Sequence, residues 1–296
     1  MAARTRLDRT DDLLMLFNRI THGFTGAGLE EARARGYQGY LEWQLAPEGI
    51  DDSALAPMLA RFYSLRMSSR QIVDVYGRNQ LRIPVAELKA ATLLRRVFSR
   101  WQLYERMVEF WTDHFNIAQS RGDGRILKTV DDREVIRRYA LGKFPDLLAA
   151  SAHSPAMLVY LDNVTNRKEA PGENYARELL ELQTLGPDAY TEATVKEVAR
   201  CLTGWSMYPK NDLSYGRFRF NGPWHDTGSK QVLHYFIGAG GGESDGQQLL
   251  HFLGTHPATA QMVARKLCQW FLTYSPPRSV VDRVAQAYLS TGGDIR

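Results

Sequence analysis

Apolar residues recur every three or four positions along most of the chain, which is the spacing of helices with one buried face. The longest run covers about residues 85–116, and its later part places Met107, Phe110, Trp111 and His114 on one side. Shorter stripes of the same kind cover about residues 131–141, 191–204, 257–271 and 278–289. The pattern therefore predicts a mainly α fold.

The pattern changes between about residues 206 and 240. Phe218-Arg-Phe220 and Val232–Ile237 alternate like short strands, and a loop bounded by Gly222 and Gly228 separates them. We expect a small β-hairpin insertion around residues 216–238, followed by a glycine-rich connector. The whole chain, residues 1–296, is predicted to form a single large multi-helix globular domain that includes this insertion.

Residues 174–186 predict a helix that carries paired carboxylates beside an apolar face. Asn174, Glu178 and Glu181 fall on one stripe because residues three and four apart share a helix face. Asn174 is expected to cap the helix, and Gly186-Pro187 to end it. The stripe is typical of an inward-facing site in a helical bundle, and equally of a surface pair between Arg177 and Glu181.

Charge and composition limit the partners and the cellular compartment that the sequence predicts. Lys and Arg total 37 against 33 Asp and Glu, a net charge of +4 that is too small and too scattered to predict a nucleic-acid partner. Cys201 and Cys268 lie in helical patterns and are predicted to be buried, reduced thiols. Because the chain has neither a transmembrane stretch nor an apolar signal segment, we expect a soluble cytoplasmic protein, unless a presequence has been removed.

Candidate chemistry comes from histidines and carboxylates on separate predicted helices and loops. Imidazole and carboxylate ligands suit a divalent transition metal such as zinc, iron or manganese. The predicted ligands are His114, Glu178, Glu181 and His225. The predicted catalytic residues are Glu178, Glu181, Asp226 and Lys230.

Several of these residues also have a structural interpretation. His114 lies on an apolar face, as a hydrogen-bonded core histidine does. Glu178 and Glu181 can accept from Arg177, from Lys196 or from buried amides. Asp226 can form an Asx-turn ahead of Gly228. His256 precedes Pro257 and is expected to cap the helix that follows.

Six blocks occur along the chain in a fixed order. They are Phe110-Trp-Thr-Asp-His-Phe115, Glu173-Asn-Tyr-Ala-Arg-Glu-Leu-Leu-Glu-Leu182, Val198-Ala-Arg-Cys-Leu-Thr-Gly-Trp205, His225-Asp-Thr-Gly-Ser-Lys230, His256-Pro-Ala-Thr-Ala260 and Gly292-Gly-Asp-Ile-Arg296. Over nearly its whole length the chain resembles the bacterial domain-of-unknown-function 1800 family. This resemblance implies a mostly helical protein without an assigned reaction.

The resemblance also implies a protein partner, a sulfatase-like protein of the domain-of-unknown-function 1501 family. Where the family usually has a histidine after the second carboxylate block, this chain has Gln183. Members of the family typically continue past the last block, so the chain is expected to lack the family's C-terminal helices. An apolar surface left open in that way would favour an oligomer or a partner.

Two functions of different class follow from these observations. In the first, the protein is a metal- or small-ligand-binding enzyme, a hydrolase or an oxidoreductase, that uses the His/carboxylate site. In the second, it is a non-catalytic helical scaffold that binds a partner, and the same polar residues form a buried structural network.

Overall fold

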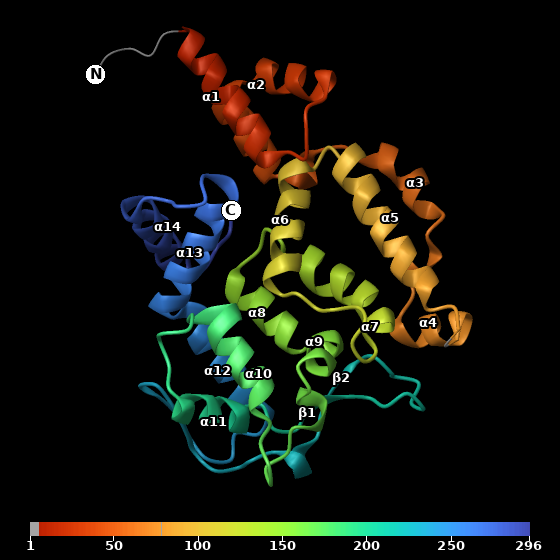
Figure 1. Ribbon diagram of the computed structural model, residues 1–296, viewed down its shortest axis with the longest axis vertical. Helices are drawn as coiled ribbons and strands as arrows, with labels where there is room; N and C mark the ends of the chain where they lie inside the picture. The colour runs from red at the N-terminus through yellow and green to blue at the C-terminus, as the bar shows by residue number, and fades with distance from the viewer. Residues whose placement is uncertain (1–5, 78) are drawn as a thin grey trace.

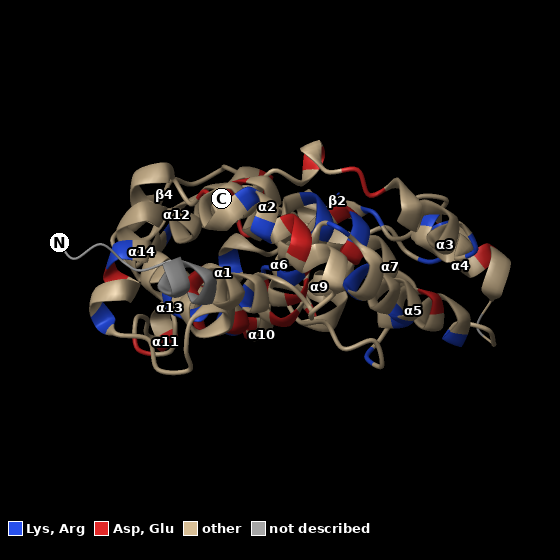
Figure 2. Ribbon diagram, turned by 90° about the horizontal axis from the view of Figure 1, so that it is seen from above, with Lys and Arg blue, Asp and Glu red and all other residues tan. Residues whose placement is uncertain are grey.

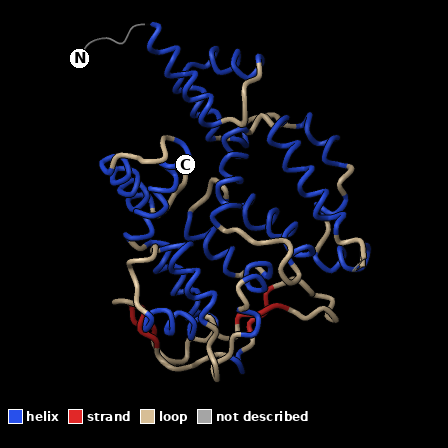
Figure 3. Tube along the Cα trace, viewed as in Figure 1, coloured by secondary structure: helices blue, strands red, loops and turns tan. Residues whose placement is uncertain are grey.

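The computed structural model describes residues 6–77 and 79–296, with side chains from Asp12 onward. Within these residues helices make up most of the fold, and the few short strands lie in two separate places in the lower part of the view (Figure 1, Figure 3). The prediction of a mainly α protein with a small β insertion is confirmed.

The first helices form the top and one side of the molecule in Figure 1. They are α1 (Arg6–Ile20), α2 (Gly26–Leu45), α3 (Ala56–Ala60), α4 (Ser69–Tyr76), α5 (Arg82–Phe98) and α6 (Gln102–His114), with short 3-10 turns at Pro47–Gly49, Ser53–Leu55 and Tyr63–Arg66. The predicted continuous run 85–116 is wrong at Ser99 and Arg100, where α5 ends and the chain turns. The Asp52 carboxylate accepts there from the Ser99 hydroxyl at 2.8 Å and from the Arg100 amide at 2.6 Å.

The middle of the chain supplies helices that lie mostly below α6 in Figure 1. They are α7 (Gly124–Asp131), the π-helix η4 (Asp132–Arg137), α8 (Phe144–Ala152), α9 (Pro155–Tyr160), the 3-10 turn η5 (Asn163–Thr165), α10 (Glu173–Glu178), the π-helix η6 (Leu179–Thr184) and α11 (Glu192–Cys201). The prediction that Asn174 caps the carboxylate helix is wrong, because Gly172 is the N-cap residue. The Asn174 amide instead donates to Leu161 O at 3.3 Å and to the Asp162 carboxylate at 3.1 Å. As predicted, the helix ends at Gly186, which has a φ of +86°.

The β region consists of two separate antiparallel hairpins. β1 (Trp205–Met207) pairs with β2 (Phe218–Phe220), and β3 (Lys230–Val232) pairs with β4 (Tyr235–Ile237). A single hairpin made of residues 218–220 and 232–237 is therefore wrong in its pairing. The predicted strand 232–237 contains a turn of its own, at Leu233, which has a φ of +53°.

Three C-terminal helices complete the fold, α12 (Glu243–Thr255), α13 (Pro257–Phe271) and α14 (Arg278–Thr291). α12 packs on α8 and α13 packs on α14. His256 caps α13 as predicted, since its ring accepts from the Ala258 amide at 3.1 Å. One apolar cluster extends from α1 to α14, and it includes Cys201 and Cys268, whose thiols are free and buried as expected.

The charged residues are interspersed along the helices, as Figure 2 shows. This arrangement agrees with the small net charge of +4. None of the helices in the described part of the chain is both long enough and apolar enough to cross a bilayer.

Candidate functional site

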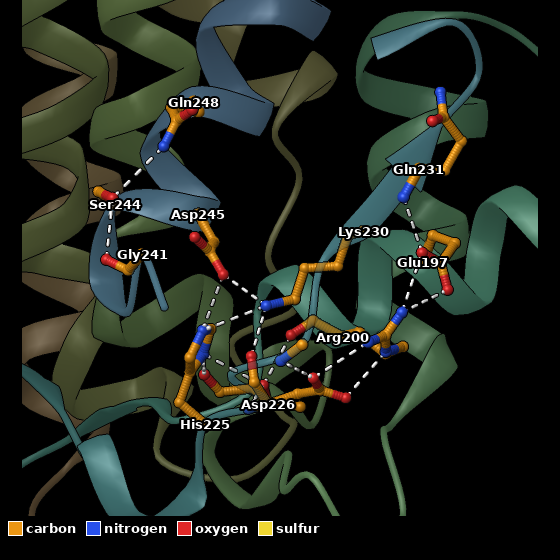
Figure 4. Close-up of polar contacts among 12 residues, drawn as sticks. Glu197, Arg200, His225, Asp226, Lys230, Gln231, Gly241, Ser244, Asp245 and Gln248 are labelled. Carbon is orange, nitrogen blue, oxygen red and sulfur yellow. Dashed lines mark hydrogen bonds and ion pairs between the residues drawn. The ribbon is translucent and has the colours of Figure 1, made fainter. Parts of the chain in front are cut away.

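Two predicted site residues, His225 and Lys230, meet Asp245 in a buried cluster (Figure 4). His225 directly follows a 3-10 turn, η7 (Gly222–Trp224), Lys230 begins β3, and Asp245 lies in the first turn of α12. Their side chains are at most 1% exposed. The cluster therefore joins three segments that are separate in sequence, inside the protein.

The His225 ring is held from both sides. Nδ1 lies 2.8 Å from the carbonyl oxygen of Thr203, which can only accept, so the proton is on Nδ1. Nε2 lies 3.1 Å from an Asp245 carboxylate oxygen and 3.5 Å from Lys230 Nζ. With the proton on Nδ1, Nε2 is an acceptor and faces the ammonium group of Lys230.

Lys230 has a partner for each of its three N–H groups. Nζ donates to the Asp245 carboxylate and to the backbone oxygen of Asp226, and it faces Nε2 of His225. These three partners leave no N–H group of Lys230 for a substrate. In this arrangement Lys230 balances the charge of Asp245.

Asp226 belongs to a second, more exposed group beside the first. Arg200 on α11 donates to both of its carboxylate oxygens, at 2.8 and 3.1 Å, and the Gly228 amide donates to one of them at 2.9 Å. The guanidinium of Arg200 is the main reason that the pKa of Asp226 is lowered. The Asx-turn predicted ahead of Gly228 is confirmed.

The same arginine connects α11 to the β3–β4 hairpin. Arg200 also binds both carboxylate oxygens of Glu197, at 2.8 and 3.0 Å, and Glu197 accepts from the backbone amide of Gln231 in β3 at 2.8 Å (Figure 4). These two ion pairs and the buried cluster fasten the hairpin to α11 and α12.

His114 lies in a different part of the interior, among Phe110, Trp111, Phe115 and Phe144. Its Nδ1 lies 3.1 Å from Lys266 Nζ, so it accepts, and its Nε2 donates to the carbonyl oxygen of Gln183 at 3.2 Å. Burial, reinforced by the charge of Lys266, lowers the pKa of His114 to about 3. The ring is therefore neutral at pH 7, with both nitrogens engaged by protein groups.

Glu178 and Glu181 do not share a common partner. Glu181 accepts from the Tyr190 hydroxyl at 3.0 Å, whereas Glu178 has no hydrogen bond or ion pair with the described residues. The alternative surface pair between Arg177 and Glu181 is wrong. Arg177 instead binds both carboxylate oxygens of Glu192, at 2.7 and 2.9 Å.

Glu181 lies within a π-helix, η6, which begins directly after Glu178. In η6 the Leu185 amide bonds to Leu180 O, five residues back, at 2.8 Å. A π-turn holds more residues than the α-helical turn on which the predicted stripe was based.

The four predicted metal ligands are distributed between separate places. His225 belongs to the buried cluster, His114 to the aromatic region beside α13, and Glu178 and Glu181 to α10 and η6. Across residues 12–77 and 79–296, no three His, Cys, Asp or Glu side chains are grouped so that they could hold one metal ion.

Sequence reasoning missed Asp245, the acid of the buried cluster. The only signal was an acidic residue in the first turn of a helix after a glycine run, which normally indicates a favourable helix-dipole interaction. Glu197 and Arg200 were missed for a similar reason, because they resemble solvated residues on the polar face of α11. Which charges they meet depends on how the hairpin folds back.

The chain belongs to the family described as "Protein of unknown function (DUF1800)", whose profile matches residues 15–296, nearly its whole length. The resemblance drawn from the six sequence blocks is confirmed. No curated protein matches the chain, and no solved structure does. Membership adds no reaction, because the family's description assigns none.

Proposed function

We propose that this protein is a helical binding scaffold, in which His225, Lys230 and Asp245 form an internal clamp rather than a reaction centre. The observation that carries this proposal is that the three side chains are at most 1% exposed and that each N–H of Lys230 faces a partner. A catalytic acid, base or nucleophile has to reach its substrate within hydrogen-bond distance. A sealed and saturated ammonium group is instead typical of a structural ion pair.

The energetics of buried charge support a clamp. An ion pair withdrawn from water pays a large desolvation penalty, so the pair adds little by itself, but removal of one partner leaves a buried charge without compensation. Lys230 lies on β3 and Asp245 on α12, and a glycine-rich connector leads from the β3–β4 hairpin to α12. The pair therefore fixes how the hairpin sits on the helices.

A double-mutant cycle tests the clamp. Lys230→Met and Asp245→Leu are each expected to lower the free energy of unfolding by about 3–5 kcal/mol, because each leaves the other charge buried alone. The double variant is expected to recover most of that loss, since no charge remains. Denaturant unfolding of the four proteins measures both effects.

The surface pair of Arg121 and Asp162 serves as the matched control for this cycle. Its side chains are 50% and 58% exposed, so Arg121→Met is expected to change the free energy of unfolding by less than about 1 kcal/mol. If Lys230→Met and Asp245→Leu proved as mild as this control, the cluster would not be holding the fold, and the clamp would be rejected.

A protein partner is part of the same proposal. The family resemblance implies a sulfatase-like protein of the domain-of-unknown-function 1501 family, and a scaffold without a reaction of its own needs something to bind. Co-expression of the two chains followed by size-exclusion chromatography measures the interaction. Separate elution of the two proteins at micromolar concentration would exclude this partner while leaving the clamp to be judged by the unfolding cycle.

A further inference from the structure

A cavity of about 620 Å³ lies between the start of α2, the end of α1 and the end of α5, near the top of the molecule in Figure 1. One of its walls is aromatic. Phe24, Phe17, Tyr40 and Trp43 follow one another with ring centroids 5.2, 5.8 and 5.8 Å apart. A volume of this size with such a lining is typical of a pocket for a small organic molecule.

The last two turns of α5 supply apolar groups on another side of the cavity. Leu93, Val97 and Phe98 line it and are 62%, 54% and 53% exposed. Exposed apolar side chains that gather at a cavity, rather than occurring singly, indicate a surface that binds something. Together with the aromatic wall they offer contact to a ring system.

The charged residues that line this cavity are Glu31, Arg96 and Arg100. Glu31 pairs with Arg100, and Arg96 pairs with Glu109 outside the lining. The lining itself therefore has two guanidinium groups and one carboxylate. Arg96, which lines the cavity, is 36% exposed and contacts Glu109 at 3.0 Å, so it retains N–H groups for a further acceptor.

The remaining polar groups of the lining also favour an acceptor on the ligand. The first turn of α2 carries no acidic residue, although a helix N-terminus attracts negative charge. The hydroxyl of Tyr40 has no hydrogen-bond partner among the described residues. Burial lowers the pKa of His22, so this neighbouring ring is neutral at pH 7 and does not alter the charge balance.

We propose that this cavity binds an aromatic carboxylate, with its ring against the aromatic wall and its carboxylate at Arg96 and the first turn of α2. The ring replaces water on Phe24 and on the exposed residues of α5. The carboxylate takes up the surplus positive charge. This inference adds a small-molecule site to the binding scaffold proposed above, and it involves none of the residues of the clamp.

Isothermal titration with two isosteric probes tests the ligand class. 2-Naphthoate carries the carboxylate, and 2-naphthamide has the same ring without the charge. We expect 2-naphthoate to bind at least about tenfold more tightly, because a guanidinium–carboxylate contact is a charge-assisted hydrogen bond. Equal affinity of the two probes, or no binding of either at millimolar concentration, would overturn the proposal.

Two variants locate the binding. Arg96→Gln is expected to weaken 2-naphthoate about tenfold and to leave 2-naphthamide unchanged, since it removes only the charge. Arg265→Gln, an exposed residue on α13, is the matched control and should change neither probe. Ala27→Trp, at an exposed position of the lining, places a ring in the cavity and should abolish binding of both probes.

These outcomes are independent of the clamp. An unchanged affinity in Ala27→Trp would place the ligand elsewhere and reject the cavity, whatever the unfolding cycle of Lys230 and Asp245 gives. Conversely, a failed clamp would leave the titrations intact. Circular dichroism of each variant checks that a lost affinity does not reflect a lost fold.

Discussion

At the scale of single residues, surroundings rather than residue type decide what each histidine does. His114 contacts a lysine ammonium and a backbone carbonyl among aromatic rings, and its pKa is lowered to about 3 by burial. His225 is equally enclosed, but it faces the carboxylate of Asp245. Two residues that the sequence predicts as equivalent metal ligands therefore have different electrostatic environments.

The low pKa of His114 predicts a pH-dependent stability. The ordinary pKa of histidine, 6.5, applies to the unfolded chain, so between pH 6.5 and pH 3 the unfolded chain binds one proton more than the folded protein at this position. The contribution of the neutral His114 to stability is therefore complete above pH 6.5. Below that pH the free energy of unfolding falls by up to about 1.4 kcal/mol per pH unit. Denaturant unfolding between pH 7 and pH 4 measures this dependence.

His114→Gln removes the titrating group and keeps a side chain that can donate to Gln183 O. We expect the variant to lose less stability between pH 7 and pH 4 than the wild-type protein does. His251→Gln, an exposed histidine on α12, is the control and should keep the wild-type slope. Parallel curves for the wild-type protein and His114→Gln would contradict the assignment.

At the scale of elements, close approach between α12 and β1 constrains a glycine. A Cβ added to Gly246 would lie 2.3 Å from the Trp205 ring, well inside contact distance. Glycine in a helix interior normally lowers stability by about 0.5–1 kcal/mol relative to alanine. Its presence in α12 is explained by the tryptophan of β1 that packs against it.

A pair of substitutions separates packing from helix propensity. Gly246→Ala is expected to lower the free energy of unfolding by about 1–3 kcal/mol, because the added methyl group overpacks the interface with Trp205. A Cβ added to Gly39, in α2, would lie 3.6 Å from its nearest neighbour, which is an ordinary contact. Gly39→Ala is therefore expected to raise the free energy of unfolding by about 0.5–1 kcal/mol. Thermal or denaturant unfolding shows the sign of each change, and a gain for Gly246→Ala would disprove the packing argument.

At the scale of the whole molecule, the arrangement of helices separates the groups that the sequence predicts as one metal site. His114 and His225 each have both ring nitrogens engaged by other protein groups, and Glu178 and Glu181 lie on either side of the α10–η6 junction. Binding of an ion by all four would require these contacts to break first.

Metal content is therefore expected to be low. Protein purified from medium containing zinc, iron and manganese should carry well below one transition-metal ion per chain, as measured by elemental mass spectrometry. A near-stoichiometric ion that disappears in both His114→Gln and His225→Gln would instead support the shared His/carboxylate centre, and the binding-scaffold proposal would have to be abandoned.

The sequence by itself determined the features that repeat locally. Apolar spacing predicted most of the helices. His256 before Pro257 predicted a helix cap, and Gly186-Pro187 predicted a helix end, because these features depend on neighbours within a few residues. Six ordered blocks were enough to identify the family. The position of the β insertion could also be predicted from the sequence, although its strands pair as two hairpins.

Only the tertiary structure decided which charged groups meet. Asp245 joins Lys230 and His225 because α12 packs against the β3–β4 hairpin, and a break of α5 at Ser99 depends on Asp52, about fifty residues earlier in the chain. The π-helix η6 was likewise not predicted by the α-helical spacing of residues 174–186. Electrostatic partners lie far apart along the chain and periodicity is a local property, so these contacts have no counterpart in the sequence pattern.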